Sequence, residues 1–196
     1  MHWYQLLLFS VYIITVIYIV NCLIARQIKR VHFREAAVYI TTMAMLGVFG
    51  EVFVGSVYHA LFGHALWLYR VAPVHLGYTS YYAPFIWGAL GFHIYLLHNY
   101  LKARNVEATL HLALIFSLET ILLEILGNGS FKLFFGHYLF YYLPGDLWHL
   151  TSLQTLPFYF PAGIIMVKAV RHFKTDPRFY SIMCLLLAFT LVYLAK

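Results

Sequence analysis

The sequence EVFVGSVYHALFGH, from Glu51 to His64, is matched by EILGNGSFKLFFGH, from Glu124 to His137. Each stretch begins with a glutamate in apolar surroundings and ends in Phe-Gly-His, and the two lie 73 residues apart. When residue i is set against residue i+73 from Glu51 onward without a gap, nine of 39 positions are identical. The matches include Glu, Gly, His and Pro, which aliphatic composition alone does not explain. The agreement predicts an internal repeat.

The composition outside these stretches predicts a membrane protein. The chain has 196 residues, of which 63% are hydrophobic and only 10% charged, whereas soluble domains carry about 25% charged residues. Apolar runs of about twenty residues recur, which is the length that a membrane-spanning helix needs. We therefore expect an all-α, polytopic membrane helix bundle with about six transmembrane helices. The expected spans are residues 3–25, 36–61, 80–101, 107–127, 150–172 and 177–195.

The basic residues indicate the topology. The net charge is +6, but the Lys and Arg residues are spread over alternate short connections, which argues against a nucleic-acid-binding tract. The positive-inside rule places these connections in the cytoplasm and both termini outside it. The N-terminal apolar run is too long for a cleaved signal peptide, so we expect a retained first span.

The repeat fits this topology. We expect a single transmembrane domain over residues 1–196, with repeats at about 36–101 and 107–174. A shift of two spans preserves the direction through the membrane, which predicts parallel repeats about an axis along the membrane normal. Glu51 and Glu124 then lie at equal depth on opposite sides of that axis. The alternative is an old duplication kept only for packing.

The two connections on the outer side, residues 62–79 and 128–149, are rich in aromatic residues and histidine. Such side chains suit the headgroup boundary, so these segments are expected to lie in the interface or to fold over the bundle as a lid. Asn128 begins an Asn-Gly-Ser match to the glycosylation acceptor pattern, although so short a pattern is usually coincidental.

The glutamates are the candidate catalytic groups. An acid within a span is costly and normally faces a partner or a cavity, and apolar surroundings favour its protonated form. Glu51 and Glu124 are therefore predicted to act as a general acid–base pair. His64 and His137 are candidate catalytic residues that orient or reprotonate these glutamates, or alternatively they are polar tips at the interface.

Aromatic residues make up 19% of the chain and suggest how a substrate is held. Aromatic faces stabilise a cation that has no hydrogen-bonding atoms, so acids inside an aromatic cage suit protonation of a carbon–carbon double bond. Lipid-facing and interfacial packing explains most of the aromatic residues. The predicted substrate-binding residues are Trp67, Tyr69, Phe85, Tyr142, Trp148 and Phe158.

One sequence pattern of this chain resembles that of the small integral-membrane carotenoid enzymes. The pattern is a glutamate, followed by Phe-Gly, a Tyr and a helix that begins with Pro. These enzymes are the lycopene cyclases of the heterodimeric or fused type and the bisanhydrobacterioruberin-type hydratases. The pattern falls on Glu51, Phe62-Gly63-His64, Tyr69 and Pro84, and again on Glu124, Phe135-Gly136-His137, Tyr142 and Pro157. This chain has His in place of a tyrosine, a frame one residue longer, and no Pro-x-Glu-Glu/Asp motif. The resemblance implies cofactor-free, proton-initiated cyclisation, hydration or isomerisation of an isoprenoid lipid.

The sequence is also compatible with other functions. Parallel repeats with acids on the axis also suit a transporter or channel for a cation or proton. His93 or His98 with His111 could ligate a b-type haem. Spacings of five residues between histidines argue against a diiron site, and the two isolated cysteines argue against a cysteine metal site. We expect no metal or cofactor, a lipid or isoprenoid substrate and no nucleic acid, with self-association or a partner subunit undecided.

Overall fold

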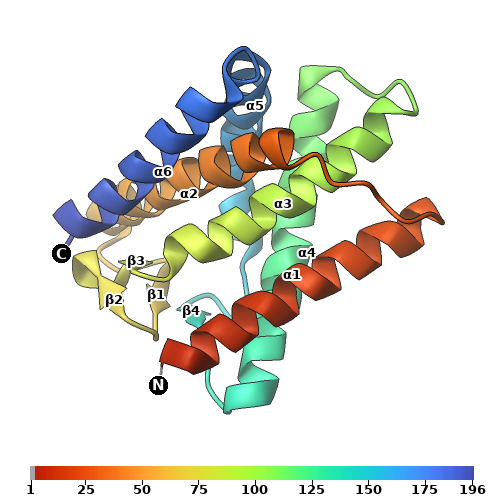
Figure 1. The fold of residues 1–196 in the computed structure, drawn as a ribbon. Coiled ribbons are helices and arrows are strands. Elements are labelled where there is room, and N and C mark those ends of the chain that lie inside the picture. Colours follow the sequence, from red (N-terminus) through yellow and green to blue (C-terminus); the bar gives the residue numbers. More distant parts are fainter. Residues whose placement is uncertain (1–2) are drawn as a thin grey trace.

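The computed structural model describes residues 3–196, and it is 73% helical. Its six α-helices pack together, with short strands gathered at one end (Figure 1). The prediction of an all-helical bundle is confirmed, and five of the helices are long and apolar enough to cross a membrane. The helices are α1 (Trp3–Ala25), α2 (Phe33–Phe62), α3 (Ala83–Lys102), α4 (Thr109–Phe135), α5 (Leu156–Phe173) and α6 (Pro177–Leu194).

Among the helices of residues 3–196, α3 is the one that is not apolar enough to count as a candidate membrane span. Its 20 residues are long enough, because a rise of 1.5 Å per residue gives about 30 Å. However, it contains His93, His98 and Asn99. α3 packs against both α1 and α2 and buries the two histidines. A helix that is covered by protein needs little lipid-facing surface and therefore tolerates these polar side chains.

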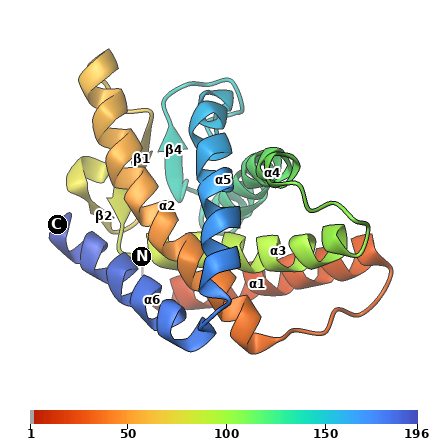
Figure 2. The ribbon, with the colours of Figure 1, turned by 90° about the horizontal axis from the view of Figure 1, so that it is seen from above.

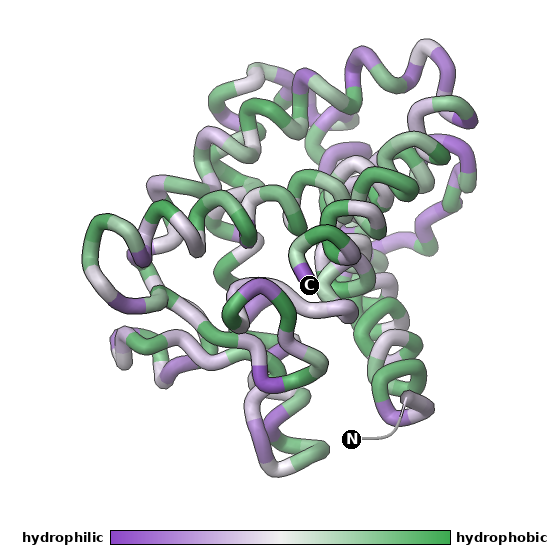
Figure 3. Tube along the Cα trace, turned by 90° about the vertical axis from the view of Figure 1, so that its left-hand side faces the viewer, coloured by the Kyte–Doolittle hydropathy of each residue, from purple (hydrophilic) through white to green (hydrophobic). Residues whose placement is uncertain are grey.

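α1 and α6 lie at the periphery of the bundle. α1 packs mainly on α3, and α6 mainly on α2 (Figure 2). Both helices expose many large apolar side chains, among which Leu and Ile are the most frequent. In Figure 3 the hydrophobic colour follows the helices, while the hydrophilic colour is concentrated in the connections. This distribution suits helices whose outer faces contact lipid.

The two halves of the repeat end their first helix in the same way. α2 ends at Phe62 and α4 at Phe135, and Gly63 and Gly136 follow with left-handed φ angles of 73° and 75°. Each glycine N–H donates a 2.8 Å hydrogen bond to the carbonyl oxygen four residues earlier. Glycine adopts this conformation without strain. The repeated Phe-Gly pair is therefore a helix stop.

The aromatic connections meet in a two-stranded antiparallel sheet. β1 (Trp67–Tyr69) pairs with β4 (Phe140–Tyr142), and Leu68 lies opposite Tyr141. These two residues are 73 positions apart, so each faces its own repeat equivalent. That register places a local two-fold axis between the strands. The remaining short elements are β2 (Pro73–Val74), β3 (Thr79–Ser80) and two 3₁₀ turns, His75–Gly77 and Leu153–Thr155.

Two predicted helix bounds were wrong by more than three residues. α4 continues eight residues past its expected end at residue 127, and α5 begins at Leu156 rather than at residue 150. Gly-Asn-Gly at 127–129 favoured a break, but Asn128 is fully buried. Its side chain donates to two backbone carbonyls and accepts from one backbone N–H within residues 139–150. Asn128 thus ties the second aromatic connection to α4 and is not a surface glycosylation acceptor.

The three basic connections lie together at the end opposite the strands (Figure 1). The Arg171 guanidinium donates to the Glu107 carbonyl at 2.6 Å and to the Thr109 hydroxyl at 2.9 Å. Lys174 lies 3.8 Å from Glu35 at the start of α2. Both described chain ends lie at the strand end. The positive-inside rule assigns the basic end to the cytoplasm, and this orientation stays a prediction.

Candidate active site

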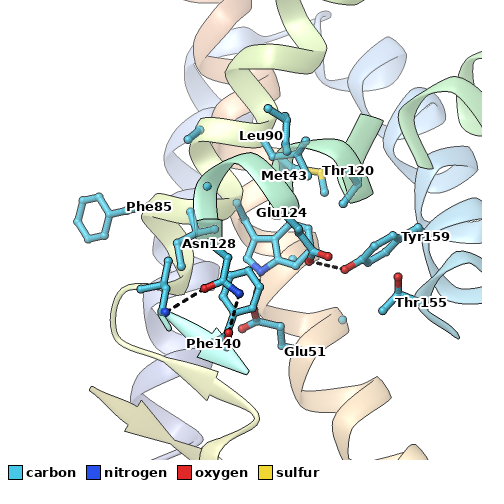
Figure 4. A pocket seen from close by; sticks show the side chains of 18 of the residues that line it. Met43, Glu51, Phe85, Leu90, Thr120, Glu124, Asn128, Phe140, Thr155 and Tyr159 are labelled. Atoms are coloured by element: carbon cyan, nitrogen blue, oxygen red, sulfur yellow. Dashed lines mark hydrogen bonds between the residues drawn. The ribbon is translucent and has the colours of Figure 1, made fainter. Parts of the chain in front are cut away.

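One cavity of about 180 Å³ lies inside the bundle, and both Glu51 and Glu124 line it. Its walls come from α1 to α5 and from β1 and β4. Figure 4 shows the two glutamates among the side chains around the cavity. Most of the other lining residues are aliphatic or aromatic. The two predicted acids therefore share one apolar site.

The Glu51 carboxyl group is held by three donors from three different elements. Tyr69 on β1 and Trp87 on α3 donate to Oε1, the indole N–H at 2.8 Å, and Thr79 on β3 donates to Oε2. Glu51 is only 5% exposed. A buried carboxyl group is stable only when its oxygens are satisfied, and these three contacts do so.

The Glu124 carboxyl group has a matching but different set of partners. Tyr159 on α5 donates to Oε1 at 2.6 Å, and Tyr142 on β4 lies 3.1 Å and 3.3 Å from the two oxygens. The Thr151 hydroxyl contacts Oε2. Tyr142 and Tyr159 also contact one another at 3.2 Å. Every partner of Glu124 is therefore a hydroxyl group, whereas Glu51 has one N–H partner.

The strands join the two halves of the site. Tyr69 and Tyr142 reach the glutamates 18 residues before them in sequence, one from each paired strand. Burial, with the nearby carboxyl group, raises the pKa of each of these tyrosines well above its ordinary value. Both hydroxyls therefore stay protonated and able to donate. Trp87 and Tyr159 form a second bridge, with ring centroids 6.2 Å apart.

No family model, curated protein or solved structure matches the chain. The contacts of the two carboxyl groups are therefore the basis for assigning a function. Two acids and a set of neutral hydrogen-bond donors in an apolar cavity can exchange protons with a substrate that has few polar atoms.

The aromatic residues predicted to bind substrate can now be placed. Trp67, Tyr69 and Tyr142 line the cavity from the strands, and Phe85 and Phe158 line it from α3 and α5. Trp148 does not belong to the lining and is 72% exposed. It lies in the loop after β4, at a left-handed φ of 54°. The prediction that Trp148 binds substrate in this cavity is not supported.

The structure does not bring His64 and His137 into the site. Both side chains are exposed, and neither lines the cavity. Each ring Nδ1 contacts the carbonyl oxygen of the next residue, at 3.0 Å and 3.1 Å respectively. Each ring also packs edge-on against an aromatic ring of the preceding helix, Tyr58 or Phe131. These contacts hold both histidines beside the helix ends and outside the cavity, which does not support the catalytic role predicted for them.

Four residues that touch the carboxyl groups were not predicted from the sequence. They are Thr79, Trp87, Thr151 and Tyr159. In the i+73 register Trp87 aligns with Phe160, and Tyr159 aligns with Ile86. The equivalent contacts are thus made from positions that differ by one residue, so a search for identities could not find them.

The histidines considered as haem ligands have other partners. His93 is buried between Asn21, whose side-chain nitrogen lies 2.9 Å from Nδ1, and Glu119, whose carboxyl oxygen lies 3.1 Å from Nε2. His98 Nδ1 contacts the Tyr39 hydroxyl at 2.7 Å. His111 is exposed on α4. Residues 3–196 contain no group of three or more His, Cys, Asp or Glu side chains placed to hold a metal ion.

Proposed function

We propose that this chain is an integral-membrane enzyme that uses Glu51 and Glu124 for proton-initiated chemistry on an isoprenoid or carotenoid-type lipid. The observation that carries the proposal is that two carboxyl groups, from equivalent positions of the repeat, line one apolar cavity. The resemblance to carotenoid cyclases and hydratases points to the same chemistry. The reaction is a cyclisation, a hydration or an isomerisation.

The size of the cavity sets what can enter. An engineered protein cavity of about 150 Å³ holds a benzene molecule. The cavity of about 180 Å³ therefore accommodates a group the size of a six-membered ring. It is too small for a whole carotenoid or polyprenyl chain. The reacting end of the substrate would occupy it while the rest of the chain stays outside.

The hydrogen-bond partners assign different roles to the two acids. An indole N–H can only donate, so Trp87 requires a lone pair on Oε1 of Glu51. A hydroxyl group can donate or accept, so the partners of Glu124 tolerate both its protonated and its ionised form. The indole therefore confines a proton on Glu51 to Oε2, whereas either oxygen of Glu124 can carry one, and on this difference we assign Glu124 as the general acid. Glu51 is the carboxylate that stabilises positive charge and accepts a proton.

The proposed reaction is balanced in protons. Glu124 gives its proton to one carbon of a double bond, and the electron pair of that bond forms the new C–H bond. The resulting carbocation is stabilised by the faces of Trp67, Tyr69 and Phe140 around the cavity. Loss of a neighbouring proton to Glu51 gives the isomerised product. In a cyclisation a second double bond first attacks the carbocation; its electron pair forms the ring C–C bond, the positive charge moves to its other carbon, and a proton next to that carbon is lost to Glu51. Return of the proton from Glu51 to Glu124 restores the enzyme. Addition of water with loss of a proton gives the hydrated product instead.

The test compares two conservative substitutions in the purified protein, reconstituted with lycopene or a polyprenyl alcohol in D₂O. Glu124→Gln keeps the size of the side chain but removes the acid, and we expect the rate to fall by about 10²–10⁴-fold. Glu51→Gln can still accept from Trp87, and we expect a smaller loss. Wild-type product should carry one deuterium at the protonated carbon. ¹⁸O from labelled water marks a hydratase.

Two results would count against the proposal. Equal and mild losses in both variants would show that neither carboxyl group transfers the proton. Proton flux across the vesicle membrane that depends on both glutamates, without any product, would favour the transporter alternative.

A further inference from the structure

We infer that the cavity opens sideways into the lipid bilayer between α1 and α4, and that the reacting end of an apolar chain enters there. The inference rests on the proposed function and deepens it, because it specifies a substrate that stays dissolved in the membrane. The opening depends on how α1 is attached to the bundle, because α1 forms one wall of the cavity. Its residues in that wall are Phe9, Ser10, Ile13, Ile14 and Ile17.

α1 is attached to α4 near the strand end of the bundle. The Phe9 ring packs edge-on against Phe131, with centroids 4.9 Å apart. The Tyr12 ring packs in the same way against Phe134, also at 4.9 Å, and its hydroxyl lies 3.4 Å from that of Ser130. These contacts close the outer part of the interface with aromatic side chains.

A second attachment lies near the basic end. Asn21 contacts His93 of α3, and His93 contacts Glu119 of α4. The Asn21 side-chain nitrogen also donates to the Ile17 carbonyl oxygen at 2.9 Å. α1 is thus joined to α4 through a polar bridge rather than by direct packing. Phe9 and Asn21 are 12 residues apart, or about 18 Å along a helix axis.

Between the two attachments the interface is incomplete. Ile14 of α1 and Leu126 of α4 both line the cavity, yet they are 46% and 37% exposed. Side chains that face both an internal cavity and the outside mark an opening. Gly127 lines the cavity on the same side, and a Cβ atom built on it meets nothing within 4 Å. The missing side chain therefore leaves free space there.

The chemistry of this opening selects its ligand. Ile13, Ile14, Ile17, Leu123 and Leu126 offer only hydrocarbon, and they lie on helices that can cross the membrane. A water-soluble substrate gains nothing from such a passage. A polyprenyl or polyene chain can lie along the outside of α1 and α4 and insert its end between them. The opening thus explains how a cavity of about 180 Å³ can serve a much longer lipid.

The test measures access to the cavity without requiring catalysis. Trp67 and Trp87 line the cavity, whereas Trp3 and Trp148 are exposed outside it. The full-length protein with Trp3→Phe and Trp148→Phe, in phosphatidylcholine vesicles, therefore reports fluorescence quenching at the cavity. We would titrate 1-bromohexadecane as the membrane-dissolved quencher and iodide as the aqueous one.

We expect bromohexadecane to quench strongly and iodide weakly. Gly127→Phe should lower the slope of the bromohexadecane quenching plot about threefold or more, because its phenyl ring fills the free space beside residue 127. Gly127→Ala adds only a methyl group and should lower the slope less. The control is Leu122→Phe, an exposed α4 position outside the cavity lining. It should leave the slope unchanged.

The outcomes separate this inference from the proposed function. Unchanged quenching in Gly127→Phe, or stronger quenching by iodide than by bromohexadecane, would overturn the lateral opening even if the enzyme forms product. If Gly127→Phe abolishes the quenching by bromohexadecane but the wild-type protein converts no isoprenoid, the lateral opening is supported and the proposed enzymatic function is contradicted.

Discussion

Two glycines of α2 provide a matched test of the site, because both line the cavity but only one has free space. A Cβ atom on Gly47 would lie 2.0 Å from Cγ of Trp87, so Gly47→Ala must displace the indole. A Cβ atom on Gly50 meets nothing within 4 Å. The two substitutions add the same methyl group to the same helix. They should differ only in their effect on Trp87.

The expected magnitude follows from three terms. Overpacking costs about 1–3 kcal/mol, and loss of the hydrogen bond from Trp87 to the Glu51 carboxyl group costs about 1.5–3 kcal/mol. Alanine in place of a helical glycine returns about 1 kcal/mol. Taken together, these terms predict that Gly47→Ala destabilises the protein by about 3 kcal/mol. Gly50→Ala displaces nothing and should stabilise the protein by up to about 1 kcal/mol.

The assay is thermal unfolding in one detergent, followed by circular dichroism. For a chain of this length, 1 kcal/mol corresponds to about 2–4 °C. Gly47→Ala should lower the Tm by about 6–12 °C, and Gly50→Ala should raise it by about 2–4 °C. Equal Tm values for the two variants would refute the close packing of Trp87 against α2. They would also remove the basis for its hydrogen bond to Glu51.

Three further substitutions test separate contacts. Asn128→Ala leaves two backbone carbonyls and one N–H unsatisfied, so it should cost about 3 kcal/mol in thermal unfolding and speed limited proteolysis after α4. Trp87→Phe removes the N–H that contacts Glu51 and should lower kcat roughly tenfold, the effect of about 1.4 kcal/mol, in the lipid-conversion assay. Glu35→Gln breaks only the half-buried 3.8 Å pair with Lys174, and a change above about 0.5 kcal/mol in unfolding free energy would contradict its assignment as a weak pair near the surface.

The helices were predictable from the sequence because lipid imposes a simple pattern. Long apolar runs, separated by connections that are alternately basic and aromatic, locate all six helices. The predicted first and last residues of α1 both agree with the structure. The error at the end of α4 has a physical cause. Asn128 looks like a helix breaker in sequence, but inside the bundle its amide satisfies backbone groups of a distant connection, and tertiary hydrogen bonds outweigh local propensity.

The contacts of the two carboxyl groups were predictable only where the repeat is identical. Glu51, Tyr69, Glu124 and Tyr142 recur at i+73, and each tyrosine contacts the glutamate of its own half. His64 and His137 also recur, but both lie outside the cavity and contact the backbone after their helix ends. Identity between repeats therefore reports shared geometry, which includes both catalytic candidates and helix stops.

The differences between the halves carry the proposed chemistry. Duplication supplies two equal carboxyl groups, whereas a reaction that moves a proton onto a substrate and then off it needs two unequal ones. In the proposed mechanism Trp87 supplies that inequality, because the donor-only indole confines a proton on Glu51 to Oε2, whereas the hydroxyl partners of Glu124 leave both of its oxygens open to a proton. The strand pair keeps the two halves in register, so the proposed acid and base differ by the exchange of one aromatic partner, Trp87 for Tyr159.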